Sequence, residues 1–181
     1  MSKLFGPFIQ QGYVVPDAQA AMAHWIARGV GPFFVEAHIR PPGEYDGEAI
    51  QADLTAAFAY SGDQQIEVIE QHCDTPTVYR DFLETHPQGG LHHLAAWVDE
   101  IPAKLEVLAA GGHDYRVRQR YGDMHAYLDR PDEVGVMIQL MARVELMTGM
   151  FDAIRAAADA WDGTTQPIRS IDWSSGFPVI E

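Results

Sequence analysis

The strongest constraint on this chain is an internal repeat. Residues 8–35 read FIQQGYVVPDAQAAMAHWIARGVGPFFV, and residues 91–117 read LHHLAAWVDEIPAKLEVLAAGGHDYRV. An offset of 83 residues places Gln10 over His93 and Gly29 over Gly112. Because a duplicated unit dictates the architecture, the chain is expected to consist of two similar modules.

Each copy predicts a strand, a capped helix, a glycine and a second strand. Residues 8–15 and 91–98 are rich in β-branched, aromatic and other apolar residues, which favours strands. Asp17 and Asp99 follow as candidate helix caps. Gly111 begins a glycine pair that ends the second helix.

Three further strands are expected in each half, which gives an α+β fold of two tandem βαβββ modules. They are predicted at 32–40, 52–61 and 64–71, and at 113–121, 123–130 and 134–141. The predicted divisions are a first module at 1–74, a linker with a short helix at 75–90, a second module at 91–142, and a C-terminal helix and tail at 143–181.

Charge and composition exclude several classes of partner. The chain has 26 acidic and 12 basic side chains, a formal net charge of −14, which disfavours nucleic acids and anionic membranes. No segment approaches the roughly 18 consecutive apolar residues of a membrane-spanning helix, and no signal peptide is recognisable at the start. Cys73 is the single cysteine, so an internal disulfide is excluded. A cytoplasmic protein that binds a small molecule is expected.

Three segments resemble a known family. They are the VPD that ends the first strand, GLHHLAAWVDE at 90–100 and HAYLDRPDEVGVMIQL at 125–140. These are similar to the vicinal oxygen chelate superfamily, which includes glyoxalase I, methylmalonyl-CoA epimerase, extradiol dioxygenases and bleomycin-resistance proteins. The resemblance covers residues 8–142 and is closest to the glyoxalase I and epimerase branch. It implies an eight-stranded cup around a divalent metal ion, with the C-terminal helix as an addition, and a homodimer.

The resemblance also implies the metal ligands, which are Gln10, Glu67, His93 and Gln139. Strand alternation agrees with these faces, because Gln139 would point away from the apolar face formed by Ile138 and Leu140. By the same alternation His92 would point opposite to His93, so at most one of the two would be a ligand.

The residue types in this set limit the chemistry. A glutamine can bind a metal through its carbonyl oxygen but cannot act as a general base, so Gln10 and Gln139 can only coordinate. A Mg, Mn, Ni, Co or Zn ion would then act as a Lewis acid that stabilises an enolate derived from a small carbonyl compound or thioester. Such a lyase, isomerase or epimerase needs a separate base. The candidates are Glu67, His125 and Tyr127, the last two as proton relay or substrate anchor.

Other interpretations stay open at this point. One is that no metal binds, and that the cup is either a metal-free enzyme or a binding protein of the bleomycin-resistance type. A two-histidine, one-carboxylate iron site is not met, since only His93 matches a ligand position. The segment 41–47 is expected to be a loop, as a lid or a solvated turn. Three alternating arginines at 116, 118 and 120 indicate either an exposed edge strand or an anion-binding strand.

Overall fold

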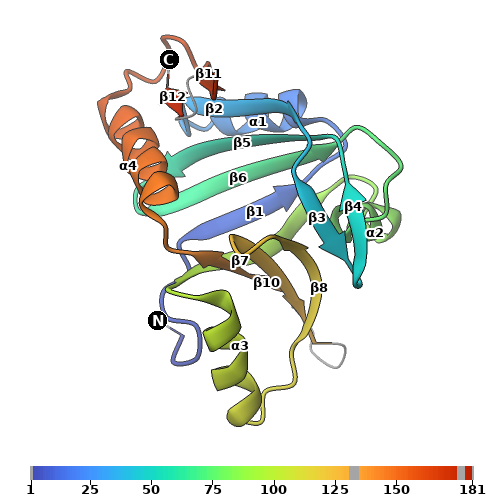
Figure 1. The fold of residues 1–181 in the computed structure, drawn as a ribbon. Coiled ribbons are helices and arrows are strands. Elements are labelled where there is room, and N and C mark those ends of the chain that lie inside the picture. The colour runs from blue at the N-terminus through green and yellow to red at the C-terminus, as the bar shows by residue number, and fades with distance from the viewer. Residues whose placement is uncertain (1, 131–134, 175–177, 181) are drawn as a thin grey trace.

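A single curled sheet organises the molecule. The computed structural model describes residues 2–130, 135–174 and 178–180. In these ranges the strands form one sheet in the order β12-β11-β2-β5-β6-β1-β7-β10-β9-β8-β3-β4. Figure 1 shows the sheet curling so that its two halves face each other, with helices outside and across its ends. The α+β fold predicted from the repeat is confirmed.

The sheet divides into two equivalent halves at its centre. The first half contains β1 (Gln10–Val14), β2 (Phe33–Ile39), β5 (Leu54–Ser61) and β6 (Gln64–Gln71). The second contains β7 (Gly90–Val98), β8 (Arg116–Tyr121), β9 (His125–Asp129) and β10 (Met137–Ala142). In each half the first strand pairs in parallel with the last, and the antiparallel pair β1 and β7 joins the halves. Residues 131–134, where the predicted connection between the strands at 123–130 and 134–141 and the first residue of the latter fall, lie outside the described residues.

Two equivalent helices cover the convex side of the halves. In α1 (Ala18–Ile26) the residues Ala18 and Met22 pack on Ile66 and Val68, which alternate with Glu67 along β6. In α3 (Ile101–Ala110) Ile101 and Leu108 pack in the same way on the second half. Because side chains alternate along a strand, a residue such as Glu67, which lies between Ile66 and Val68, points to the concave side of the sheet.

The helix caps agree with the sequence in one copy and differ in the other. Asp17 accepts a hydrogen bond from the Ala20 amide at 2.9 Å, as expected for a cap. The cap position of α3 is Glu100 rather than Asp99, and its side chain makes no capping bond.

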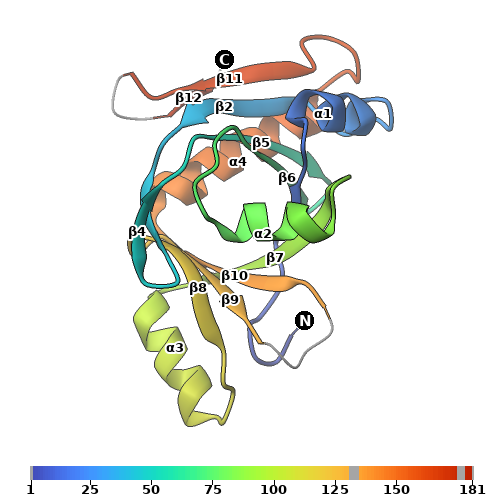
Figure 2. The ribbon, with the colours of Figure 1, turned by 90° about the vertical axis from the view of Figure 1, so that its right-hand side faces the viewer.

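The two remaining helices close the ends of the curled sheet. Figure 2 shows α2 (Val78–Thr85) across the near opening and α4 (Glu145–Ala160) across the far one. The helix expected from residue 75 begins at Val78 because Thr77 caps it, accepting from the Arg80 amide at 3.1 Å. Within the described ranges, none of the helices has the length and apolarity required to span a membrane.

The segment expected to be a loop is a β-hairpin. It consists of β3 (Pro42–Tyr45) and β4 (Glu48–Gln51), and β3 pairs with β8. Since β2 leads directly into β3, the hairpin links the outer strand of one half to the outer strand of the other. The segment is therefore part of the sheet and not a loop.

The same hairpin explains the alternating arginines. β8 has a neighbour on both sides, so it is not an edge strand. Arg116 and Arg118 pair with Asp46 in the hairpin turn at 2.5 and 2.9 Å, and Arg118 also contacts Asp81 of α2 at 2.8 Å. These charges hold the hairpin and α2 to the sheet.

The C-terminal segment also joins the sheet. β11 (Ile168–Asp172) pairs in parallel with β2, and β12 (Val179–Ile180) pairs with β11. Trp173, which directly follows β11, turns back against the concave side of β2 through a bond to Glu36. The tail is therefore part of the cup wall as well as of the outer surface.

Candidate functional site

The four side chains implied as ligands project from the four central strands of the sheet. They are Gln10 on β1, Glu67 on β6, His93 on β7 and Gln139 on β10. In the ladder, Gly12 lies opposite both Glu67 and His93. Ala95 lies opposite both Gln10 and Gln139. This register places all four on one patch of the concave face.

Each of these side chains is buried and presents an atom without a hydrogen-bond partner. The exposed fractions are 1% for Gln10, 7% for Glu67, 0% for His93 and 2% for Gln139. The atoms without partners are Gln10 Oε1, Glu67 Oε2, His93 Nε2 and Gln139 Oε1. Leaving a buried polar atom unpaired costs about 1–3 kcal/mol. Four at one place indicate a site built for something that they bind.

The glutamines are anchored so that their oxygens stay free. Gln10 Nε2 donates to Gln65 Oε1 at 2.6 Å, and Gln139 Nε2 donates to the Tyr127 hydroxyl at 2.8 Å. An amide group held through its nitrogen has a fixed orientation for its oxygen. In both residues the free atom is therefore the one that can bind a cation.

The spacing of the other two atoms is compatible with a shared cation. Glu67 Oε2 and His93 Nε2 lie 3.1 Å apart but are not aligned as a hydrogen bond. Two ligand atoms at ~2.1 Å from one ion, at tetrahedral or octahedral angles, are roughly 3.0–3.4 Å apart. Three oxygens and an imidazole nitrogen form a donor set that Mg²⁺, Mn²⁺ or Zn²⁺ accepts. The residues present fit a divalent metal.

Gly12 is a site residue that the sequence analysis missed. A Cβ built on it would lie 1.9 Å from His93 Cε1 and 2.3 Å from His93 Nε2. The glycine therefore leaves the space in which the imidazole lies. An isolated glycine inside a strand often marks such a close approach, and that signal was available in the sequence.

The orientation of His92 differs from the one that strand alternation predicts. The ladder between β1 and β7 shifts after Gly12, so His92 is the extra residue of a β-bulge. Its ring therefore lies beside that of His93, with the two Nδ1 atoms 3.0 Å apart. Burial, with a smaller effect of His93, lowers the pKa of His92 well below its usual value. A neutral His92 can accept the Nδ1 proton of His93 and leave Nε2 of His93 with its lone pair facing Glu67.

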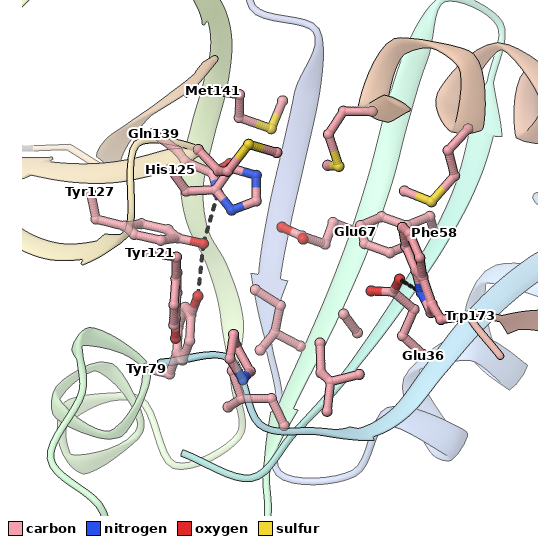
Figure 3. Close-up of a pocket in the computed structure, with 18 residues that line it drawn as sticks. Glu36, Phe58, Glu67, Tyr79, Tyr121, His125, Tyr127, Gln139, Met141 and Trp173 are labelled. Atoms are coloured by element: carbon pink, nitrogen blue, oxygen red, sulfur yellow. Dashed lines mark hydrogen bonds between the residues drawn. The ribbon is translucent and has the colours of Figure 1, made fainter. Parts of the chain in front are cut away.

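A cavity of about 260 Å³ opens in front of this patch. Glu67 and Gln139 form part of its wall, and His125 and Tyr127 line it as well (Figure 3). The rest of the lining is largely apolar, and includes Phe58, Leu54, Ile69, Met124, Met141, Met147 and Met150. No lysine or arginine is among the described residues that line it.

Tyrosine hydroxyls form a hydrogen-bonded wall on the side of the second half. Tyr79 of α2 donates to the Tyr127 hydroxyl at 2.7 Å, and Gln139 donates to the same oxygen. Burial raises the pKa of Tyr127 and Tyr79 well above the usual value and that of Tyr121 to about 12. The three hydroxyls are therefore protonated at neutral pH. Tyr127, which accepts two hydrogen bonds, retains its own proton for donation.

His125 belongs to the same wall. Burial is the main cause that lowers its pKa, and the negative charge of Glu67 acts in the opposite direction. The imidazole is therefore neutral at pH 7 and can both accept and donate a proton.

A second carboxylate faces the cavity from the first half. Glu36 on β2 accepts a hydrogen bond at 2.5 Å from the indole Nε1 of Trp173 (Figure 3). Burial raises the pKa of Glu36, the indole lowers it, and Glu67 raises it further. Neither residue was identified from the sequence, because the contact depends on how the C-terminal segment packs.

One other cluster offers metal-ligand types. His38, Asp53 and His72 bring donor atoms within 4.8 Å of one another. Asp53 is already paired with Arg40 at 2.7 Å, and His72 contacts the Thr55 hydroxyl at 2.8 Å. This group is thus a surface network of ion pairs and hydrogen bonds.

Comparisons with known proteins agree with this arrangement. The profile of the Glyoxalase/Bleomycin resistance protein/Dioxygenase superfamily matches residues 9–128. No curated protein sequence matches the chain significantly.

Solved structures share the fold at low identity. The methylmalonyl-CoA epimerase from Mycobacterium tuberculosis is 16% identical with a TM-score of 0.54, over 82% of this chain and 95% of that one. A hypothetical protein from Bacillus halodurans is 14% identical with a TM-score of 0.53, over 77% and 95%. A mutant 4-hydroxymandelate synthase from Streptomyces coelicolor is 12% identical with a TM-score of 0.52, over 77% of this chain and 38% of that one. With two thirds of its length matched and the fold shared, the chain belongs to the glyoxalase/bleomycin resistance protein/dioxygenase superfamily, the vicinal oxygen chelate proteins.

Proposed function

We propose that this protein is a metal-assisted isomerase, epimerase or lyase that removes a proton next to the carbonyl group of a small compound. The observation that supports this most is the set of four buried lone-pair atoms without hydrogen-bond partners beside an apolar cavity. In a purely structural core such atoms are normally paired.

In this proposal Gln10, Glu67, His93 and Gln139 hold the ion. A bound divalent cation supplies Lewis-acid stabilisation of the negative charge that develops on the carbonyl oxygen. Glu67 is the anionic member of the set, so the affinity for the ion depends most on this residue.

The other polar side chains of the cavity bind and orient the substrate. Tyr127 donates its free hydroxyl proton to the substrate carbonyl oxygen, because its own oxygen already accepts from Tyr79 and Gln139. His125 is neutral and passes a proton to or from the substrate. The methionine and aromatic lining excludes water, which strengthens these electrostatic interactions.

The lining favours a neutral, largely apolar substrate. Two carboxylates and no lysine or arginine face the cavity among its described lining residues. A volume of about 260 Å³ is slightly below the ~300–1,000 Å³ of typical ligand pockets. A neighbouring structure is a methylmalonyl-CoA epimerase in complex with methylmalonyl-CoA, which keeps the acyl group of a thioester as a candidate.

A metal-free binding protein is the second candidate. Four methionines line the cavity, and flexible, polarisable methionine side chains suit varied apolar ligands. This alternative predicts an apolar ligand held without metal and without chemical change.

Metal analysis separates the two candidates. Protein purified without chelator should contain close to one divalent ion per chain by mass spectrometry, and apo protein should bind Zn²⁺ or Mn²⁺ in calorimetry. His93→Gln should weaken this binding strongly, whereas His125→Gln in the same cavity should retain it. Equal binding by both variants, or none by the wild type, would contradict the metal site.

Proton exchange tests the reaction. Phenylacetone and the N-acetylcysteamine thioester of propionate serve as a neutral ketone and a thioester probe. In D₂O the loaded protein should accelerate loss of the NMR signal of the proton next to the carbonyl. Binding without exchange of either probe would favour the binding protein.

We also propose that the protein is a homodimer in the cytoplasm. Exposed apolar residues such as Leu146, Ile168 and Val179 are compatible with a partner surface. Sedimentation equilibrium distinguishes a dimer from the 20.1 kDa monomer.

A further inference from the structure

Glu36 is a half-buried carboxylate that the metal set does not use. It lies on β2, the strand of the first half that pairs with β5, and lines the same cavity as Glu67. Figure 3 shows the two carboxyl groups approaching the cavity from the same half of the sheet. Among the described residues that line the cavity, Glu36 and Glu67 are the two that carry a carboxylate.

The C-terminal segment fixes one oxygen of this carboxylate. Trp173 Nε1 donates to Glu36 Oε1 at 2.5 Å, and the tryptophan ring lines the cavity itself. Glu36 Oε2 has no hydrogen-bond partner in the described part of the chain. Trp173 lies outside the region 9–128 that matches the superfamily profile.

The surroundings of Glu36 suit proton transfer. Phe58, Met147 and Met150 line the cavity beside it, and burial raises the pKa of its carboxyl group. A carboxyl whose pKa moves toward neutrality can both take up and release a proton at physiological pH. Gln139, in contrast, has no proton affinity that would let it act as a base.

We propose that Glu36 is the acid–base residue of this cavity and that Trp173 positions it, an inference that rests on the proposed proton removal. Oε2 takes the proton from the carbon next to the substrate carbonyl. The C–H electron pair becomes the C=C bond of the enolate, and the carbonyl π pair moves to oxygen. After its proton has exchanged with solvent, the carboxylic acid returns one to the same carbon, which leaves Glu36 ionised and exchanges that hydrogen with no redox change.

The first experiment replaces the carboxylate and keeps its shape. Glu36→Gln retains an oxygen that accepts from Trp173, so it should fold and bind Zn²⁺ as the wild type does. Its proton exchange with phenylacetone should fall by ~100- to 10,000-fold, the usual contribution of an acid–base group. Glu36→Asp should keep part of the activity, and Glu48→Gln, which changes an exposed carboxylate on β4, should keep all of it.

The second experiment examines positioning without activity. Carbon-13 NMR of labelled glutamate carboxyls, assigned with Glu36→Gln, gives the pKa of Glu36 directly. Trp173→Phe keeps an aromatic side chain but removes the indole N–H donor that lowers this pKa. The pKa of Glu36 should therefore rise, and the ascending limb of the exchange-rate profile should shift to higher pH. The other titratable groups lining the cavity are Glu67, His125, Tyr79, Tyr121 and Tyr127, and they are the same in both proteins.

The outcomes distinguish this inference from the proposed function. If the wild type exchanges the probe and Glu36→Gln exchanges it equally fast, Glu36 is not the acid–base residue although the proposed function stands. If the wild type exchanges neither probe, both fail. An unchanged Glu36 pKa in Trp173→Phe would overturn the role of the tryptophan.

Discussion

The two halves of the sheet share a backbone frame but present different chemistry to the cavity. In the first half Glu67 pairs in the ladder with Phe58, and in the second Gln139 pairs with Tyr127. The anionic candidate ligand therefore stands beside an apolar ring. The neutral one stands beside a hydroxyl that it binds.

A second difference lies in the strands that join the halves. Gly12 occupies in β1 the place that Ala95 occupies in β7, at the offset of the repeat. The glycine gives room to the imidazole of His93, while the alanine faces the slimmer Gln10. A duplicated scaffold can therefore divide its tasks, with negative charge in one half and hydrogen-bond donors in the other.

The strongest test exchanges the charge between the halves. Glu67→Gln should weaken Zn²⁺ binding by more than the roughly 10- to 100-fold typical of changes around a metal's ligands, because it removes the anion itself. Gln139→Glu should tighten binding by adding one. Calorimetry of both variants measures the difference.

The double exchange sharpens this test. A glutamate at 139 would accept a hydrogen bond from the Tyr127 hydroxyl, whose proton would then no longer be free for the substrate carbonyl oxygen. In the double variant, which combines Glu67→Gln with Gln139→Glu, metal binding should return, whereas proton exchange should recover only in part. Equal metal affinity in all the variants would show that the position of the charge is irrelevant.

The next largest effect concerns the glycine. Gly12→Ala introduces a methyl group 1.9 Å from His93 Cε1, and such overpacking costs about 1–3 kcal/mol. For a chain of this length that lowers Tm by roughly 2–4 °C per kcal/mol. Calorimetric unfolding measures it.

The matched control is the equivalent residue of the other half. Ala95→Gly should cost only about 1 kcal/mol, through backbone entropy. His93 imidazole NMR signals should shift in Gly12→Ala more than in Ala95→Gly. A larger shift of the His93 signals in Ala95→Gly than in Gly12→Ala would contradict the proposed difference between β1 and β7.

A smaller effect is expected at the tyrosine. Tyr127→Phe leaves the Gln139 amide and the Tyr79 hydroxyl without their shared acceptor, at a cost of about 1–3 kcal/mol shared between them. Phe58→Leu, at the equivalent place, removes ring volume without disturbing a hydrogen bond. Urea unfolding together with binding of phenylacetone should show weaker carbonyl anchoring in Tyr127→Phe alone.

The smallest effect is on the pH dependence of stability, and its sign differs between the halves. Burial lowers the pKa of His125 below 6.5, so the unfolded chain takes up the proton first and stability falls as pH drops below that value. Burial raises the pKa of Glu36 above 4.5, so stability falls as pH rises from that value toward the raised pKa.

Two variants separate these contributions. His125→Gln should flatten the loss of stability on the acidic side of neutrality, and Glu36→Gln should flatten the loss above about pH 4.5. Tm measured across this range checks both. Parallel shifts in the two variants would contradict the opposite signs.

Much of the fold followed from local patterns. The repeat predicted the four-strand halves and helices α1 and α3, and the helical spacing of apolar residues predicted α4, because β-branched runs, glycines and apolar spacing are local signals. The hairpin at 42–51 escaped prediction, since Pro42 and Gly43 read as a loop and its strand β3 is specified by pairing with β8. The cap position of α3 lies one residue after the predicted one, and α2 begins three residues after its predicted start, for similar reasons.

Within the site, strand alternation alone predicted that Glu67 and Gln139 point to the concave side of the sheet. It failed at His92, because a bulge breaks the period of two and cannot be recognised from GLHHLAAW. Glu36 and Trp173 are 137 residues apart, and nothing local to either residue indicates that they meet.

The sequence by itself determined the duplicated units, the faces of their strands and the types of donor available, since these depend on residue identity and on spacing along one chain. The tertiary structure decided which donors lack partners, where the cavity lies and that the C-terminal segment joins its wall. These features arise from the packing of segments distant in sequence, whose relative placement depends on the total free energy of the folded chain.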